Sequence, residues 1–273
     1  LVAGPIERPG NLLPQLREKN KLTSENARAG LCKMAVGFFK KIVVADLLAE
    51  YVNVVFNDAA NSTGPGILIA TVFFAFQIYC DFSGYTDIAI GCARVMGIKL
   101  MKNFNRPYTA LTIKDFWARW HISLSTWFRD YLYFPLGGSR CSKPRHMFNL
   151  FMVFFVSGLW HGANWTFVIW GLLHALYRIV GELTYKKREA LWAKMHVDTN
   201  KTWFRALRRL VTFVLVCFAW IFFRANSLSD MAVLLANLTV GWSNIPATLT
   251  SMDIGITSAL VAVLSIVIMS QLD

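Results

Sequence analysis

Residues 146–177 read HMFNLFMVFFVSGLWHGANWTFVIWGLLHALY, and this stretch contains no Asp, Glu, Lys or Arg. A helix that crosses a membrane needs only about 20 apolar residues. An uncharged run of this length therefore predicts two shorter helices in sequence. We expect the break between them near Gly162-Ala163-Asn164, where small and polar residues interrupt the apolar run.

The composition of the whole chain supports a membrane protein. Of its 273 residues, 55% are hydrophobic, 14% are aromatic and only 16% are charged, whereas soluble domains are about 25% charged. The basic excess, 28 Lys and Arg against 16 Asp and Glu, lies mostly between apolar runs, as at Lys40-Lys41. That distribution is typical of cytoplasmic loops and helix ends. We therefore expect a lipid bilayer around the protein and no nucleic-acid partner.

The remaining segments predict further helices. Residues 1–27 are polar and rich in Pro, which indicates a loop or an interfacial arm. Mixed apolar and charged residues then favour a tilted or amphipathic helix at the membrane surface. The predicted elements are this helix at Arg28–Phe56, a span at Ile67–Cys80, a polar break at DFSGYTD, a shorter apolar piece at Ile88–Leu100, a span at Leu210–Phe223 that extends back to Phe204 if its arginines lie at the interface, and a span at Ile254–Met269.

The segment Ile113–Leu136 combines aromatic residues with five charged ones. Such a segment does not fit a plain spanning helix, so we expect an interfacial or re-entrant element that is buried in protein or lines a wet cavity. The predicted fold class is all-α: a polytopic helical membrane protein with re-entrant or interfacial helices. Residues 1–273 are expected to form a single helical membrane domain with five or six spanning or half-spanning elements.

The two ends of the sequence suggest a piece of a longer protein. The chain begins Leu1-Val2-Ala3-Gly4, without an initiator Met or a signal peptide, and it stops at Asp273 directly after an apolar run. We expect that N-terminal and C-terminal helices of the full protein are missing from it.

His161 is the first candidate for chemistry, because an ionisable side chain inside a membrane segment is costly and usually functional. The alternative is a neutral core histidine that bonds to a backbone carbonyl. The neighbours Gly158, Gly162 and Ala163 favour function, since small residues let a substrate or another backbone approach closely. Asn164 adds a polar group just beyond them.

His121 is the second candidate, in the string FWARWHISLSTWFRDYLYFPLGG. It is flanked by Ser123 and Ser125 and lies between Arg119 and Arg129. An interfacial histidine in an aromatic belt is the alternative interpretation.

A polar island follows the Ile67–Cys80 span. Its two carboxylates, six residues apart, are expected to form structural ion pairs with Arg94, Arg119 or Arg129. The island consists of Asp81, Ser83, Tyr85 and Asp87.

Several other kinds of site are disfavoured. The five cysteines are scattered without a C-x-x-C pair, which indicates neither a disulfide framework nor a zinc site. His161 and His174 are thirteen residues apart with no companion carboxylate, so no metal site is expected. The sequence also lacks a G-x-S-x-G elbow and a Gly-rich phosphate loop.

Five strings of the sequence occur in a fixed order over roughly residues 1–180: AGPIERPGNLLPQL, DFSGYTDIAIGCARVMGIKL, NFNRPY, DFWARWHISLSTWFRDYLYFPLGG and SGLWHGANWTFVIWGLLHALY. With these strings the chain resembles the membrane-bound O-acyltransferase (MBOAT) family, and within it the bacterial alginate O-acetyltransferase branch. The resemblance implies a helical core around a central tunnel, in which a cytoplasmic acyl donor meets an acceptor from the other face.

The resemblance also implies roles for particular residues. The histidine of the W-H-G string, here His161, is the expected catalytic residue, and the histidine of R-W-H-I-S, here His121, lies in the same funnel and positions donor or acceptor. Acyl transfer to a hydroxyl needs a base, and a neutral imidazole, with an ordinary pKa near 6.5, suits that task. Asn164 is expected to polarise the acyl carbonyl. The full set of expected substrate-binding residues is Asn164, Trp160, Trp120, Ser125, Arg129 and Asp130.

The function implied is an O-acetyltransferase of the bacterial cytoplasmic (inner) membrane. It would move an acetyl group, with acetyl-CoA as donor and no tightly bound cofactor, toward a hydroxyl of an exported, alginate-like polysaccharide. An extracytoplasmic acetyltransferase or acceptor protein would complete the transfer. Within the family, D-alanyl transfer to teichoic acid and peptidoglycan O-acetylation remain alternatives. A transporter or channel without chemistry would show polar residues on several spans or an inverted repeat, and we find neither.

Overall fold

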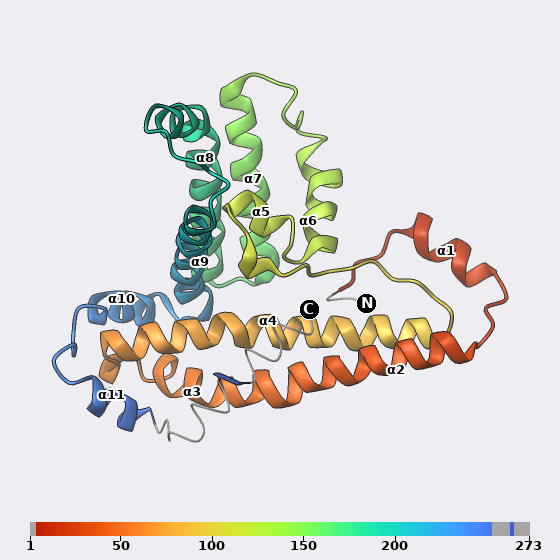
Figure 1. The fold of residues 1–273 in the computed structure, drawn as a ribbon, viewed down its shortest axis with the longest axis horizontal. Helices are drawn as coiled ribbons and strands as arrows, with labels where there is room; N and C mark the ends of the chain where they lie inside the picture. The colour runs from red at the N-terminus through yellow and green to blue at the C-terminus, as the bar shows by residue number, and fades with distance from the viewer. Residues whose placement is uncertain (1–3, 253–262, 265–273) are drawn as a thin grey trace. The chain divides into compact units, whose positions relative to one another are not determined.

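The computed structural model describes residues 4–252 and 263–264, and these residues form helices, turns and loops without a β-strand (Figure 1). Four described segments wind differently from an α-helix: η1 and η4 are π-helices, and η2 and η3 are 3-10 helices. The elements in chain order are α1 Pro9–Arg17, α2 Ser24–Phe38, η1 Phe39–Ala45, α3 Asp46–Phe56, η2 Ala59–Asn61, α4 Gly64–Val95, η3 Pro107–Thr109, α5 Ile113–Trp117, α6 Ile122–Phe128, η4 Arg129–Tyr133, α7 Lys143–His161, α8 Trp165–Lys194, α9 Thr202–Arg224, α10 Leu228–Asn237 and α11 Ile245–Ser251.

The chain divides into two compact units. Unit 1 contains the described parts of residues 1–105, 121–124 and 232–273, and unit 2 contains residues 106–120 and 125–231. Each unit is built around long helices that pack along their length. The prediction of a single domain over the whole chain stays a prediction.

Unit 1 is built on the pairing of α2 with α4, which lie side by side (Figure 1). The helical path from α2 continues through η1 into α3, as predicted for Arg28–Phe56. Two glycine pairs bring the backbones together: Gly30 meets Gly91, and Gly37 meets Gly84. A Cβ on any of the four would lie 2.5 to 2.7 Å from the carbonyl oxygen opposite, so these positions exclude larger side chains.

The predicted break at DFSGYTD is absent, because α4 runs as one helix from Gly64 to Val95. Inside this segment Ser83, Gly84 and Thr86 are buried, and Asp87 pairs with lysines of the α2–η1 path. Polar side chains that find partners inside the protein do not need to leave the helix. The polar residues therefore mark a contact face of α4.

Unit 2 is built on the hairpin of α7 and α8, with α9 packed against α8. The two helices meet at Gly158 and Gly171, whose missing side chains leave room for the backbones of Phe167 and Phe154. The break between α7 and α8 covers Gly162, Ala163 and Asn164, which confirms the prediction of two helices in the uncharged run.

The segment Ile113–Leu136 is divided into α5, α6 and η4. Between α5 and α6 the backbone of His121 has φ 45°, in the left-handed region that ordinary residues seldom occupy. A straight spanning helix is thereby excluded for this segment. Its interfacial or re-entrant position stays a prediction, and so does the central tunnel.

Three described helices are long and apolar enough to cross a membrane: α4, α8 and α9. The third spans Thr202–Arg224, which confirms the extension of the apolar run back to Phe204. The polar arm before residue 27 contains the helix α1, which the sequence did not predict. The predicted span Ile254–Met269 lies outside the described residues.

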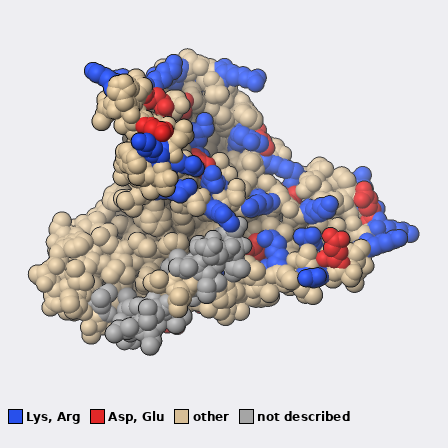
Figure 2. All heavy atoms as spheres, viewed as in Figure 1, with Lys and Arg blue, Asp and Glu red and all other residues tan. Residues whose placement is uncertain are grey.

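Charged side chains are unevenly distributed over unit 1. Figure 2 shows Lys and Arg gathered around α1 and the adjoining end of α2, whereas the surface over α10 and the start of α4 is almost uncharged on this face. An uncharged surface beside a long apolar helix is what a bilayer requires.

Candidate active site

His161 is the last residue of α7, at the point where the hairpin of unit 2 turns. The turn is tight: a Cβ at Gly162 would lie 2.9 Å from the ring of Phe167. A side chain at this position would therefore force the Phe167 ring to shift. The histidine that the sequence predicted to be catalytic therefore lies at a helix end, where a reactant can reach it more easily than within a helix.

Aromatic rings from three helices surround His161. The ring centroid of Trp160 on α7 lies 4.9 Å away, that of Trp170 on α8 lies 5.1 Å away, and that of Phe223 on α9 lies 5.2 Å away, all nearly perpendicular to the imidazole. Phe167 lies at 6.3 Å. These edge-on contacts hold the imidazole in one orientation inside a shell of aromatic rings.

Asn164 has a structural task in this site. Its Oδ1 accepts a hydrogen bond of 3.1 Å from the backbone N–H of Thr166 and so caps the N-terminus of α8. Its Nδ2 donates to the backbone carbonyl of Asn226, just after α9, at 3.1 Å. The amide thus ties the α7–α8 turn to the end of α9. The prediction that Asn164 polarises an acyl carbonyl stays a prediction, but both ends of its amide already serve the turn.

Another histidine, His174, lies one helical turn beyond Trp170 on α8. His174 is fully buried, and its Nδ1 accepts a hydrogen bond of 3.2 Å from Nε1 of Trp117. The ring centroids of Trp170 and His174 are 5.1 Å apart. From the sequence, His174 was considered only as a metal ligand, and neither Trp170 nor Phe223 was predicted to belong to the site. The spacing of Trp170 and His174 by four residues was a usable signal, because such residues share a helix face.

His121 belongs to unit 1 and is 2% exposed. Its Nδ1 lies 3.2 Å from Oδ1 of Asn103, and its ring meets the ring of Phe82 edge-on at 4.7 Å. The same Asn103 oxygen accepts hydrogen bonds from the backbone N–H and the hydroxyl of Ser123, at 3.1 and 2.8 Å. Because that oxygen can only accept, the His121 proton lies on Nδ1 and the lone pair on Nε2.

Asn103 is thus the residue that orients His121, and it was not predicted from the sequence. It stands in the quoted string NFNRPY, but a lone asparagine gave no signal of its own. The prediction that His121 and His161 share one funnel stays a prediction.

The other predicted substrate-binding residues have contacts of their own. Trp120 is buried and stacks on Phe116, and the Ser125 hydroxyl donates to the Trp120 carbonyl at 3.3 Å. Arg129 and Asp130 form an exposed ion pair of 2.8 Å with each other. The substrate-binding role of these four residues stays a prediction.

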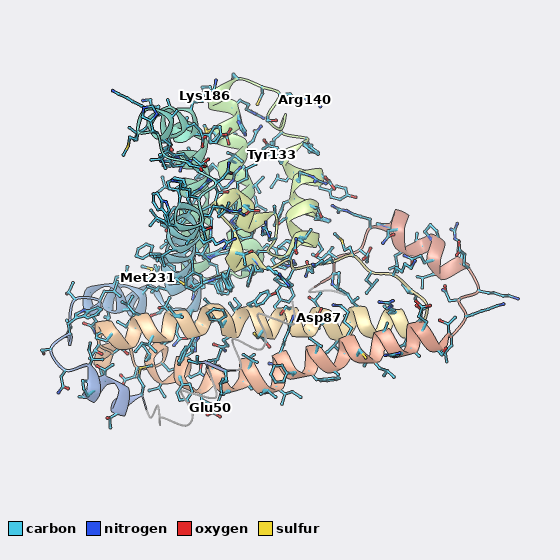
Figure 3. The ribbon with its side chains drawn as sticks, in the orientation of Figure 1. Glu50, Asp87, Tyr133, Arg140, Lys186 and Met231 are labelled. Atoms are coloured by element: carbon cyan, nitrogen blue, oxygen red, sulfur yellow. The ribbon has the colours of Figure 1, made fainter. Side chains whose placement is uncertain are left out.

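The polar island on α4 pairs with lysines and not with the predicted arginines. Asp87 contacts Lys33 at 2.7 Å and Lys40 at 3.0 Å, and Asp81 contacts Lys41 at 2.6 Å. The hydrogen bond to Asp81 raises the pKa of Lys41. Asp87, labelled in Figure 3, is the member that lies between α4 and α2. The other two members are the buried Ser83 and the partly exposed Tyr85.

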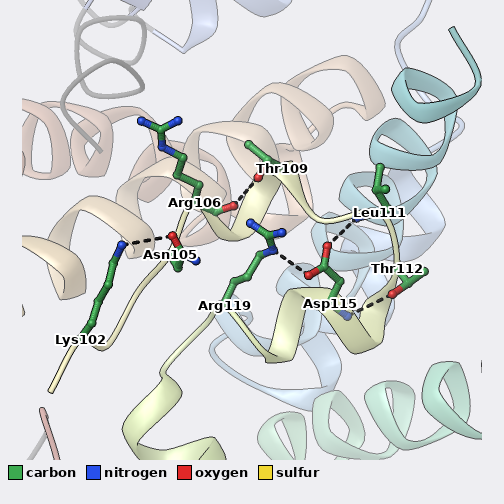
Figure 4. A network of polar contacts seen from close by, with 8 residues as sticks. All are labelled: Lys102, Asn105, Arg106, Thr109, Leu111, Thr112, Asp115 and Arg119. Atoms are coloured by element: carbon green, nitrogen blue, oxygen red, sulfur yellow. Dashed lines mark hydrogen bonds and ion pairs between the residues drawn. The ribbon is translucent and has the colours of Figure 1, made fainter. Parts of the chain in front are cut away.

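Arg119, which was predicted to pair with the polar island, forms an ion pair with Asp115 instead. In unit 2, Arg119 Nε contacts Asp115 at 2.7 Å, and Asp115 also accepts the backbone N–H of Leu111 at 3.1 Å (Figure 4). Arg119 therefore belongs to a local network around α5. Within the described residues, no group of three His, Cys, Asp or Glu side chains is placed to hold a metal ion.

The chain is similar in sequence to several known proteins over most of its length. The chain is 41% identical to the peptidoglycan O-acetyltransferase of Helicobacter pylori over 232 residues, which are 84% of this chain and 42% of that protein. It is 40% identical to the probable alginate O-acetylase AlgI of Pseudomonas aeruginosa over 84% of this chain and 41% of that protein. It is 31% identical to the teichoic acid D-alanyltransferase of Bacillus subtilis over 81% of this chain and 57% of that protein.

The chain thus spans about half the length of the curated relatives it matches, or somewhat less. Residues 1–227, which include both histidines and their neighbours, match the model of one family. On this match and on the identity to its relatives, the chain belongs to the membrane-bound O-acyltransferase family.

Proposed function

We propose that the full protein is a membrane O-acyltransferase that transfers an acetyl group to a hydroxyl of a cell-envelope polysaccharide, with His161 as the general base. The observation that carries this proposal is the position of His161 at the α7–α8 turn, enclosed by rings from α7, α8 and α9. An imidazole held in an apolar shell can accept the proton of an attacking hydroxyl, while the shell excludes water that would hydrolyse the acyl donor.

His121 is proposed to position the donor or the acceptor. The bond to Asn103 fixes its tautomer, so Nε2 presents a lone pair to a hydroxyl or a thiol. The left-handed backbone at this residue supports the assignment, since such conformations tend to persist where function requires them.

The donor, the partner and the location are part of the proposal. Acetyl-CoA on the cytoplasmic side is the proposed source of the acetyl group. The acceptor polysaccharide is reached from the other face of the bacterial inner membrane, through an extracytoplasmic acetyltransferase or acceptor protein. Two relatives at about 40% identity, both named for O-acetyl transfer, support the acetyl group as cargo.

The acceptor has two candidates among polysaccharides. An exported, alginate-like polymer is favoured by the AlgI relative, and peptidoglycan is favoured by the Helicobacter pylori relative at nearly the same identity. D-alanyl transfer to teichoic acid has weaker support, because that relative is only 31% identical.

The proposal is tested with His161→Ala in the full-length protein, expressed in a host strain that lacks its own copy. Acetate released by mild alkali is measured separately from the exopolysaccharide and from peptidoglycan. We expect the acetate of one fraction to fall by at least about 10²-fold, the contribution of a positioned general base. The fraction that loses acetate identifies the acceptor.

His196→Ala is the matched control, because this histidine is exposed in the connection between α8 and α9. It should leave acetylation unchanged. Membrane levels of both variants are compared by immunoblot. If His161→Ala is present at the normal level and both fractions keep their acetate, the catalytic role of His161 is refuted.

A further inference from the structure

The indole N–H of Trp170 is a buried donor without an acceptor among the residues that the structure describes. Trp170 is 1% exposed, so water cannot serve the donor from the surface. A buried indole N–H usually finds a hydrogen-bond partner, because an unmade buried bond is costly. The arrangement is explained if the acceptor belongs to a molecule that enters the site.

The position of Trp170 identifies the kind of acceptor. Its ring lies perpendicular to that of His161 at 5.1 Å between centroids. In acyl transfer the base lies about 3 Å from the attacking hydroxyl oxygen, and a donor lies about 3 Å from the carbonyl oxygen. In the tetrahedral intermediate both oxygens are bonded to one carbon, so the base and the donor must both lie beside the same carbonyl group. The contact between His161 and Trp170 suits that spacing.

We propose that the Trp170 indole N–H binds the carbonyl oxygen of the acyl thioester and stabilises the negative charge that develops on it. This inference rests on the proposed function, because it assigns the carbonyl-binding group of the same site. It also replaces the role first expected of Asn164, whose amide caps α8 and holds the end of α9.

The other rings around His161 are less suited to this task. Phe167 and Phe223 carry no N–H group. Trp160 carries one, but its side chain is 46% exposed, where the effective dielectric constant is higher and a hydrogen bond to a developing charge is weaker. The Trp170 donor is fixed in a buried ring cluster, so it needs no reorganisation when the charge appears.

In the proposed reaction, His161 carries the proton and Trp170 binds the oxygen on which negative charge develops. The acceptor hydroxyl oxygen attacks the carbonyl carbon and its proton passes to His161, while the π electrons of the carbonyl move to the oxygen held by Trp170. The resulting tetrahedral intermediate collapses, the carbon–sulfur bond breaks, and the departing thiolate takes the proton from His161. The products are the acetyl ester and the free thiol.

A buried water is the competing explanation for the Trp170 N–H group that has no acceptor among the described residues. His174 has its Nδ1 occupied by Trp117, so the neutral ring carries its proton on Nε2, and this second donor also has no acceptor among the described residues. One water could accept from both Trp170 and His174. Such a water would contribute to stability without changing the rate of acyl transfer, which separates the two explanations by experiment.

The test uses Trp170→Phe, which keeps an aromatic ring and removes the N–H. Membrane vesicles carrying the full-length protein and its acceptor are supplied with acetyl-CoA, and the release of free CoA thiol is followed. We expect kcat to fall by about 10²- to 10³-fold, as when one donor to an oxyanion is lost. The KM for acetyl-CoA and the amount of folded protein should stay unchanged.

The matched control is Trp192→Phe, the same substitution 22 residues further along α8, where Trp192 packs on Phe204. It should leave both kinetic constants unchanged. If Trp170→Phe does not fold, benzothienylalanine at position 170 keeps the two-ring shape and replaces only the N–H by sulfur, and the same fall in kcat is expected.

Three results would overturn the inference. They are a wild-type kcat for the variant without the N–H, a rise in KM alone, and a fall in activity that merely follows a loss of folded protein or of thermal stability. If His161→Ala is also fully active, the failure lies with the proposed function. If His161→Ala is inactive and Trp170→Phe is normal, only the carbonyl-binding role of Trp170 is refuted.

Discussion

The contact between α2 and α4 predicts that Gly37→Ala destabilises the protein, although alanine is the better helix former. The hypothetical Cβ at Gly37 would lie 2.7 Å from the carbonyl oxygen of Gly84 and 2.9 Å from the backbone nitrogen of Ile88. Ordinary contact begins at 3.4 Å, so the oxygen is about 0.7 Å too close. Neither backbone atom can rotate away, and the helices must separate.

The magnitude follows from two opposing terms. Replacing Gly by Ala inside a helix stabilises it by about 1 kcal/mol, whereas overpacking a tight contact costs about 1 to 3 kcal/mol. Separation of the helices also lengthens the ion pairs from Lys33 and Lys40 to Asp87, which lie on the same contact face. The first two terms leave a net loss of up to about 2 kcal/mol, and the longer ion pairs add to it.

The chain offers a matched control in Gly181, which lies within α8 and has open space where its Cβ would be. Gly181→Ala should be neutral or stabilising by up to about 1 kcal/mol. The assay is the unfolding temperature of the detergent-solubilised full-length protein, where 1 kcal/mol corresponds to about 2 to 4 °C for a domain of this size. If Gly37→Ala unfolds at the same temperature as Gly181→Ala, the close approach of the two helices is refuted.

Two further predictions concern polar contacts. Asp87→Asn should lower the unfolding temperature far more than Asp81→Asn, because Asp87 pairs with the buried Lys40 while the Asp81–Lys41 pair is about half exposed. The expected losses of stability are about 3 kcal/mol for Asp87→Asn and at most about 1 kcal/mol for Asp81→Asn. Equal shifts would contradict the buried position of the Asp87–Lys40 pair. Asn164→Ala should lose the cap of α8, worth about 1 kcal/mol, together with acetylation. Asn164→Asp keeps the capping oxygen but loses the donor to the Asn226 carbonyl, so it should keep the share of stability that the cap supplies and lose acetylation; full acetylation in Asn164→Asp would show that the tie to α9 is dispensable.

Much of the helical framework could be predicted from local sequence. An uncharged run of residues 146–177 is too long for one span, and Gly162 and Asn164 supply the turn and the cap that divide it. The same local logic failed at DFSGYTD, because its two carboxylates pair with lysines forty or more positions earlier in the chain. A sequence window cannot show such partners, so a contact face between helices was interpreted as a break.

The residues of the candidate site could likewise be predicted only in part from the sequence. His161 could be found from sequence because an ionisable group in an apolar run demands an explanation. Phe223 could not, since it is one of many aromatic residues until α9 brings it to the imidazole. Trp170 offered one signal, its spacing of four residues from His174 on α8, but that spacing does not show that its ring meets His161. The position of His161 in the structure also differs from the one expected from the sequence. His161 lies at a helix end rather than inside a span, so its imidazole can meet a reactant at the turn, while the rings on three sides supply the apolar surroundings that keep water from the acyl group.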